Sequence, residues 1–182
     1  KRFGIEFDEN HLHLNFCGRP VVPTNNKKKP YWRFNKVFNQ FLLPMQQILP
    51  HTIKDISKFL NSKNFSYIIG YPSIINNFCT LAKNENIDIE FKEKLIFSGC
   101  EKLYDFQKEN IESFLNVSIK DQYGFAEGTC NATQCEFGNY HEDFEFGILN
   151  TESNNTTNQK QIISTGFANY AMPLINYQVG DI

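Results

Sequence analysis

A short run two thirds of the way along the chain brings together an aromatic ring, two glycines and a carboxylate. Residues 123–128 read Tyr-Gly-Phe-Ala-Glu-Gly. A flat ring can stack on a nucleotide base, a glycine lets the backbone approach a ligand closely, and a carboxylate can hold a divalent cation on phosphate. A glycine turn after a buried strand would have the same composition. The residues alone therefore leave a nucleotide site and a plain turn both open.

Two further groups of residues could bind metal. Cys135 and His141 supply a thiolate and an imidazole, half of a tetrahedral zinc site. The residues alone favour the alternative, a buried cysteine and a loop histidine. His11 and His13 fall on one side of a predicted strand, but no third ligand is near, so we predict a surface pair and no metal there.

The elements that must position these residues alternate between strand and helix. Buried-type strands are predicted over 65–71, 94–97 and 117–123, with helices between them. Strands joined by helices of this length are typical of parallel βαβ units, so the fold class is α/β with a parallel sheet. Ligands gather at the carboxyl ends of such strands. The three strand ends carry Gly70-Tyr71-Pro72, Ser98-Gly99-Cys100-Glu101 and the run that begins at Tyr123.

Helix starts are marked by capping residues. Thr52 is predicted to cap the first helix with Asp55 three residues on, and Pro72 to open the second. Asp105 is predicted to cap the third. After residue 128 the pattern changes to short strands over 143–149, 161–165 and 174–179, with a polar turn or loop over 151–160. We therefore predict a β-rich annex in the C-terminal third.

Composition and charge exclude two classes of function. The 182 residues are 41% hydrophobic and 21% charged, which is a globular composition. A formal net charge of −2 argues against a nucleic-acid partner. No apolar run approaches the roughly 20 residues that span a membrane. Five scattered cysteines and the lack of a visible leader favour reduced thiols in the cytoplasm.

Four segments, in order, resemble the phenylacetate–coenzyme A ligase family and its capsule-biosynthesis relatives, within the adenylate-forming superfamily. They are a strand with a Gly-Tyr-Pro turn and helix over 65–86, the F-S-G-C-E-K-L loop over 97–103, Y-G-x-x-E followed by C-E-x-G-x-x-H over 121–141, and N-Y-A-M-P-L-I-x-Y-x-x-G-D within 165–181. The match covers roughly residues 50–182, and residues 1–49 match only loosely. The domain boundaries predicted in this way are a loosely matched segment over 1–50, a βαβ core over 51–128 and the β-rich subdomain over 129–182.

The resemblance implies a role for each matched position. In such enzymes a carboxylate attacks the α-phosphate of ATP and releases pyrophosphate, and the acyl group of the acyl-adenylate then passes to coenzyme A or another acceptor. Glu127 would hold Mg²⁺, and Tyr71 would lie near the acyl group of a small acid, aryl or of another kind. The residues implied for the nucleotide are Tyr123 under adenine, Asp181 on the ribose hydroxyls, and Ser98, Gly99, Glu101 and Gly124 along the adenine and acyl pocket.

Departures from the family pattern leave the activity open. The family has Thr or Ser where Ala126 stands, and Arg or Lys where Gln178 follows Tyr177. The upstream Ser/Thr/Gly-rich phosphate loop and the C-terminal lid with its lysine are not found in the sequence. A C-x-C pair that could complete zinc binding by Cys135 and His141 would follow the last motif. We therefore expect a central fragment of a ligase, with no turnover by residues 1–182 alone.

Two alternatives to this hypothesis remain. One is a truncated or degenerate relative without catalysis that acts in capsular polysaccharide biosynthesis. It is favoured if the natural gene starts near Lys1 and lacks the phosphate loop. The other is a generic βαβ binding domain, which explains the helices but not four motifs in the right order.

Overall fold

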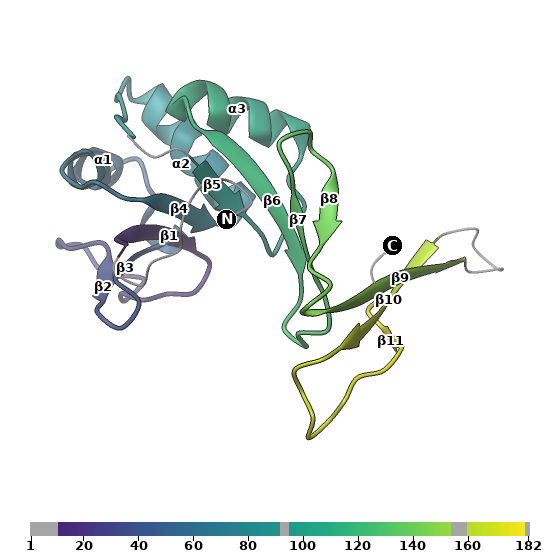
Figure 1. The fold of residues 1–182 in the computed structure, drawn as a ribbon. Coiled ribbons are helices and arrows are strands. Elements are labelled where there is room, and N and C mark those ends of the chain that lie inside the picture. Colours follow the sequence, from purple (N-terminus) through teal and green to yellow (C-terminus); the bar gives the residue numbers. More distant parts are fainter. Residues whose placement is uncertain (1–10, 92–94, 154–159, 181–182) are drawn as a thin grey trace. The chain divides into compact units, whose positions relative to one another are not determined.

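A computed structural model describes residues 11–91, 95–153 and 160–180. The chain divides into two compact units, Lys1–Asp121 (unit 1) and Gln122–Ile182 (unit 2) (Figure 1). The boundary falls within one strand, so each unit is described by itself.

Unit 1 is built on a largely parallel sheet. Its strands are β1 (His13–Cys17), β2 (Arg33–Asn35), β3 (Gln40–Pro44), β4 (Tyr67–Gly70), β5 (Leu95–Ser98) and the first part of β6 (Ser118–Gly124), in the order β2-β3-β1-β4-β5-β6. β2 runs antiparallel to β3, and the other pairs are parallel. The predicted α/β class with parallel βαβ units is confirmed.

Three helices of unit 1, together with a short 3₁₀ turn at Met45–Gln47, connect these strands: α1 (Ile53–Asn61), α2 (Pro72–Asn84) and α3 (Asp105–Leu115). α2 links β4 to β5, and α3 links β5 to β6. The apolar faces that the helices bury join the strands in one core, which includes Ile56, Ile75, Phe78 and Ile111. A hydrogen bond of 2.8 Å from the Asn110 amide to the Asn76 side chain joins α3 to α2.

The helix starts follow the sequence only in part. Pro72 is the first residue of α2, as predicted. Thr52 precedes α1, but its side chain does not cap the helix. Its hydroxyl donates to the Gln47 carbonyl and accepts a hydrogen bond of 3.1 Å from the Leu49 amide, because the preceding turn folds back onto it. Asp105 is the first helical residue of α3 rather than its cap.

The prediction of a surface histidine pair is wrong for His13. Its side chain is only 7% exposed. The imidazole stacks on Tyr67 with ring centroids 4.6 Å apart, and its Nε2 lies 2.8 Å from the Gln40 side-chain amide. The reason is the register of β1, which puts Gln40 of β3 and Tyr67 of β4 directly beside His13, where their side chains cover the imidazole.

Unit 2 is made of antiparallel strands. The end of β6 pairs with β7 (Asn131–Gln134), and β7 pairs with β8 (Tyr140–Glu142). A second sheet has the order β11-β10-β9, with bounds Tyr177–Gln178, Lys160–Gly166 and Gly147–Ser153. A β-rich C-terminal third is therefore present.

The strand bounds of unit 2 differ from the predicted ones. The strand expected over 143–149 begins later, because the Phe146 amide donates to the Asp143 carbonyl at 2.8 Å and makes a turn there. β9 then continues to Ser153, into the predicted loop, and β10 begins at Lys160. The rest of that predicted loop lies outside the described residues. The last strand is reduced to Tyr177–Gln178.

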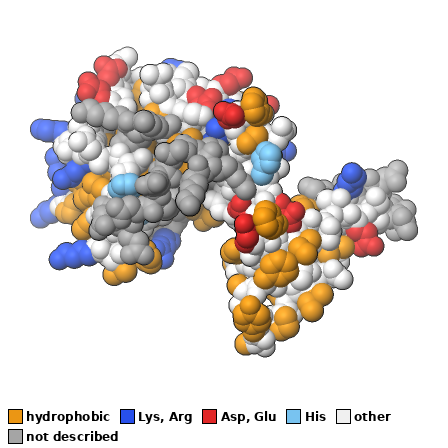
Figure 2. Space-filling view, in the orientation of Figure 1, with side chains coloured by type: hydrophobic (Ala, Val, Ile, Leu, Met, Phe, Trp, Pro, Cys, Tyr) orange, Lys and Arg blue, Asp and Glu red, His pale blue; other side chains and the backbone are white. Residues whose placement is uncertain are grey.

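Exposed apolar side chains gather on unit 2 (Figure 2). They include Phe144, Tyr170, Met172 and Ile175, each at least 64% exposed. All five cysteines are described and are free thiols. No helix in the described ranges is long and apolar enough to cross a membrane.

Candidate functional site

The carboxyl ends of β4 and β5 lie level with each other in unit 1, beside Asp121 in the middle of β6. Gly70 pairs with Ser98, and Ser98 pairs with Asp121. The Gly99 amide donates to the Gly70 carbonyl at 3.3 Å and ties the first two ends together. A Cβ on Gly70 would lie 2.7 Å from Phe16, so only glycine lets β1 approach this closely. Register and close packing therefore bring two of the three predicted strand ends together.

Ser98 lies beneath this edge rather than on it. The side chains of Ser98 and Asp121 are 2% and 5% exposed. The Ser98 hydroxyl donates a hydrogen bond of 2.8 Å to Oδ1 of Asp121. Sequence reasoning missed Asp121, although an acidic residue inside a buried-type strand is a signal that it needs a partner. The pair joins the end of β5 to the middle of β6 and holds the loop that follows Ser98.

Glu101 connects that loop to the start of α2. Its carboxylate accepts a hydrogen bond of 3.3 Å from the Ser73 amide in the first turn of α2. A carboxylate is stabilised there by the unpaired amides and by the helix dipole. Glu101 is exposed, so its second oxygen can accept hydrogen bonds from a ligand.

Tyr71 lies beside two thiols at the same edge. Its ring is near Gly18, where an added Cβ would be 3.6 Å from the ring. The pKa of the Tyr71 hydroxyl is raised by charge on the neighbouring Cys100, and further by burial, by a hydrogen bond with Cys100, by Glu101 and by Cys17. The hydroxyl is protonated at neutral pH, as tyrosine ordinarily is, and can donate. Cys100 has a left-handed backbone with φ +67°, which turns the loop sharply after Gly99.

In unit 2, residues 125–128 form a tight turn after β6. The Gly128 amide donates to the Phe125 carbonyl at 3.0 Å, and Gly128 has φ +67°. The turn is anchored by the next residue, Thr129, which is 2% exposed and shares a hydrogen bond with the Ser164 hydroxyl of β10. Gly147 presses against it so closely that an added Cβ would be 2.0 Å from the Thr129 carbonyl oxygen. The Thr129 hydroxyl is therefore buried and paired.

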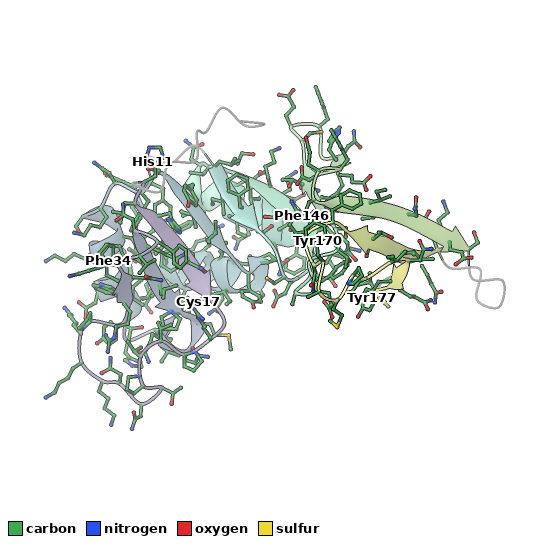
Figure 3. All side chains as sticks on the ribbon, turned by 60° about the horizontal axis from the view of Figure 1, so that its bottom comes forward. His11, Cys17, Phe34, Phe146, Tyr170 and Tyr177 are labelled. Carbon is green, nitrogen blue, oxygen red and sulfur yellow. The ribbon has the colours of Figure 1, made fainter. Side chains whose placement is uncertain are left out.

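The turn gathers three rings and one carboxylate, called here the aromatic cluster: Tyr123, Phe125, Tyr177 and Glu127. The Phe125 ring centroid is 6.1 Å from that of Tyr123 and 6.4 Å from that of Tyr177. The Tyr177 hydroxyl donates to Oε1 of Glu127 at 3.4 Å. Tyr177 lies in β11 (Figure 3). Sequence reasoning used it only as a landmark before Gln178, so the structure adds both Tyr177 and Phe125 to the candidate residues.

The remaining predicted residues are placed as follows. Gly124 is exposed, and an added Cβ would be 3.3 Å from the Asn131 side chain. The Gln178 amide donates to the Gln161 side chain across β11 and β10. Asp181 lies outside the described residues.

Cys135 and His141 share one face of the β7–β8 hairpin. His141 pairs with Thr133, and the Cys135 amide donates to the Asn139 carbonyl at 2.9 Å, so the two residues are diagonal neighbours. Among the residues that the structure describes, no group of three metal-ligating side chains occurs. The hairpin therefore presents two of the donors that zinc requires, and a closed site needs two more.

Comparison with known proteins identifies relatives of this chain and solved structures with the same fold. No family model matches the chain. The chain is 29% identical over 164 residues to Protein CapK of Staphylococcus aureus, over 90% of this chain and 36% of that protein. Among solved structures, 2-hydroxyisobutyryl-CoA ligase in complex with 2-HIB-AMP and CoA aligns with a TM-score of 0.63 and 17% identity, over 99% of this chain and 44% of that chain. The chain has the fold of the adenylate-forming CoA ligases.

Other ligases have a similar fold. A long-chain-fatty-acid-CoA ligase from Archaeoglobus fulgidus aligns with a TM-score of 0.55 and 9% identity, over 88% of this chain and 35% of that chain. The chain therefore spans little more than a third of the curated relative and under half of these ligases. The resemblance drawn from the four motifs is confirmed, and the fold is that of one part of a CoA ligase.

Proposed function

We propose that this chain is the central part of an ATP-dependent ligase that adenylates a small carboxylic acid. The observation that carries the proposal is the aromatic cluster, in which a glycine turn sets three rings beside one exposed carboxylate. Aromatic faces hold bases by stacking, and base–aromatic stacking contributes about 1–3 kcal/mol. In this proposal Tyr123 stacks on adenine, with Gly124 allowing close approach, and Asp181 accepts hydrogen bonds from the ribose.

Glu127 is the proposed ligand for Mg²⁺. Its carboxylate is exposed and has one long hydrogen bond, from Tyr177, so lone pairs remain for a cation. Mg²⁺ sites commonly use one or two carboxylates and complete the shell with water and substrate phosphates. The residue present fits that pattern, and the cation would neutralise charge on the phosphates of ATP.

The strand ends of unit 1 are proposed to meet the acid. Tyr71 supplies a protonated hydroxyl, which can donate to a carboxylate oxygen. Glu101 and Gly99 form the loop beside it, and the buried pair of Ser98 and Asp121 keeps that loop in place. Positioning of this kind supplies much of the rate in reactions with no covalent step on the enzyme.

Further groups are proposed to act with this part of the ligase. Coenzyme A is the proposed acceptor of the acyl group, because the fold is that of CoA ligases. Zinc bound by Cys135 and His141 requires two ligands from other parts of the protein. We also propose that the phosphate loop and lid come from other parts, and that the protein works in the cytoplasm with reduced thiols.

A second candidate is a non-catalytic relative in capsular polysaccharide biosynthesis. It is favoured by Ala126, which lacks the hydroxyl of the family's Thr or Ser, and by Thr129, whose hydroxyl is paired with Ser164 and so is not free to replace it. It also agrees with the similarity to CapK over 90% of this chain. This alternative keeps the fold and predicts no adenylation.

ATP–pyrophosphate exchange on the full-length protein separates the two. With a panel of aliphatic and aryl acids and Mg²⁺, the ligase proposal predicts label exchange that depends on one class of acid. Residues 1–182 alone should give none. Exchange at background level with every acid, in a full-length protein that contains the phosphate loop and lid, favours the non-catalytic relative.

A further inference from the structure

Charge is unevenly distributed along this chain. Between residues 11 and 84 the sequence contains ten Lys and Arg but a single acidic residue, Asp55. The Asp55 carboxylate is itself in an ion pair with Lys29. Residues 122–182 have the opposite balance, with seven acidic residues and one lysine. The net charge of −2 therefore averages over a strongly basic segment in unit 1 and a strongly acidic one in unit 2.

Most of these basic residues lie in three neighbouring parts of unit 1: the loop before β2, the β2–β3 hairpin and α1. The ion pair between Lys29 and Asp55 joins the loop to α1. Trp32, just before β2, stacks on Phe59 of α1 with ring centroids 3.7 Å apart. Figure 2 shows Lys and Arg side chains on the part of unit 1 where α1 and β2 lie in Figure 1. The surface that they form is called here the basic face, and its exposed residues are the three lysines at 27–29, Arg33, Lys36, Lys54, Lys58 and Lys63.

Large apolar side chains are exposed at the turn of the β2–β3 hairpin. Val37 is 81% exposed and Phe38 is 64% exposed. The Asn35 side chain accepts a hydrogen bond of 3.1 Å from the Val37 amide, and Asn39 has φ +46°, so the chain reverses here and both apolar residues lie at the tip. Turns are usually made of polar residues, and neighbouring apolar groups left in water indicate a contact surface.

Basic and apolar groups are mixed around this tip. Lys36 directly precedes Val37 in the chain. Nζ of Lys63 lies 5.9 Å from the centroid of the Phe41 ring, and that ring packs against Phe34 with centroids 4.8 Å apart. β2 is an edge strand, and in the part of the chain that the structure describes no further strand pairs with its outer side. The basic face therefore presents cations and apolar side chains together.

We propose that the basic face binds the surface of a membrane that contains anionic phospholipids. Lysine and arginine side chains near such a surface are attracted by its negative potential, and each strengthens binding several-fold. Val37 and Phe38 then enter the boundary between headgroups and acyl chains, where apolar side chains leave water. The apolar tip and the basic residues act together, because either alone binds weakly.

The tip distinguishes a membrane from a nucleic acid as the partner. Nucleic acids are held by rings that stack on bases and by hydrogen bonds to base edges and phosphates. Val37, the more exposed of the two apolar residues, has neither a ring nor a hydrogen-bonding side chain. The exposed apolar side chains of unit 2 belong to the acidic part of the sequence, which an anionic membrane repels. An anionic membrane is therefore the partner that fits both the charge and the apolar tip of unit 1.

Sedimentation of the full-length protein with vesicles tests this binding. The protein should pellet with phosphatidylcholine vesicles that contain phosphatidylglycerol and stay in solution with pure phosphatidylcholine. Raising the salt from about 0.1 M to about 1 M should weaken binding, because the Debye length falls from about 10 Å to about 3 Å. No binding to either vesicle, as would follow if another part of the protein covers this face, overturns the proposal. Binding of a single-stranded RNA, measured by fluorescence anisotropy, without binding of vesicles also overturns it.

Two double variants test the named groups. Val37→Ser/Phe38→Ser and Lys27→Gln/Lys28→Gln should each raise the lipid concentration for half-maximal binding about tenfold. All four side chains are exposed, so the urea midpoints should stay at the wild-type value. Wild-type binding by either double variant contradicts the proposal.

Matched controls lie on other elements. Phe106→Ser changes a ring on α3 that is 64% exposed, as Phe38 is. Lys83→Gln/Lys160→Gln removes two exposed lysines, on α2 and β10. Both controls should bind vesicles as wild type does. A loss of binding in the controls as large as in the test variants assigns the binding to general charge and apolarity, and so overturns the basic face as its source.

Discussion

Replacing Ser98 by alanine should destabilise the fold through a single hydrogen bond. The Ser98 hydroxyl donates to Asp121 at 2.8 Å, and both side chains are buried. A hydrogen bond to a charged group contributes about 1.5–3 kcal/mol, and a buried carboxylate that loses a donor is not compensated by water. Asp121 has further interactions, so it stays partly paired. We expect a loss of about 2 kcal/mol in the free energy of unfolding.

Urea denaturation measures this loss. For an m-value of about 2 kcal/mol per molar, the midpoint of Ser98→Ala should fall by about 1 M. Ser113→Ala, on the exposed side of α3, is the matched control and should stay within about 0.5 kcal/mol of wild type. In an Asp121→Asn background the same change at Ser98 should cost only about 1 kcal/mol, because the acceptor is then neutral. A Ser98→Ala midpoint equal to that of Ser113→Ala refutes the reasoning.

Three further changes test other parts of the structure. Gly147→Ala should lower the free energy of unfolding by about 3 kcal/mol, because its Cβ would be 2.0 Å from the Thr129 carbonyl oxygen. Gly124→Ala should lower it by less than half as much, because the nearest atom to its Cβ is a side-chain oxygen at 3.3 Å. Equal urea midpoints of the two variants contradict this packing. Burial lowers the pKa of His13 below 6.5 in the folded protein. As the pH falls below about 6.5, the imidazole is therefore protonated in the unfolded chain before it is protonated in the folded one, and the free energy of unfolding decreases. Urea midpoints should depend less on pH in His13→Gln than in wild type or in His51→Gln. If the midpoints of all three proteins change with pH in the same way, His13 is not the source of the pH dependence. Glu127→Gln should weaken ATP binding about tenfold with Mg²⁺ and little without it, by calorimetry, with Glu145→Gln as control; equal losses in both conditions argue against a metal ligand.

The elements that depend on local signals were predictable. Pro72 and the helical spacing of the apolar residues after it predicted α2. The alternation of buried strands with helices predicted the parallel sheet. Pairing between strands that are far apart in the sequence was not predictable. His13 was misassigned because β1 gains its neighbours β3 and β4 from later in the chain. Thr52 was misassigned as a cap because the turn just before the helix, rather than the helix itself, binds its hydroxyl.

Unit 2 was less predictable because its strands carry weak signals. β7 and β8 read Asn-Ala-Thr-Gln and Tyr-His-Glu, with no apolar alternation, and they are held by backbone pairing. The candidate site was found in outline from residue types at strand ends. Asp121 and Tyr177 were missed because their roles come from partners that are distant in the sequence, Ser98 and Glu127.

The central claim is that the aromatic cluster binds a nucleotide, and AMP binding measured by calorimetry tests it most directly. Wild type should bind AMP, and Tyr123→Ala should bind about tenfold more weakly, because it loses the stacking face. Tyr170→Ala is the matched control, since this ring is 91% exposed and outside the cluster, and it should bind as wild type. Equal affinity of wild type and Tyr123→Ala, or no binding by wild type, would contradict the account.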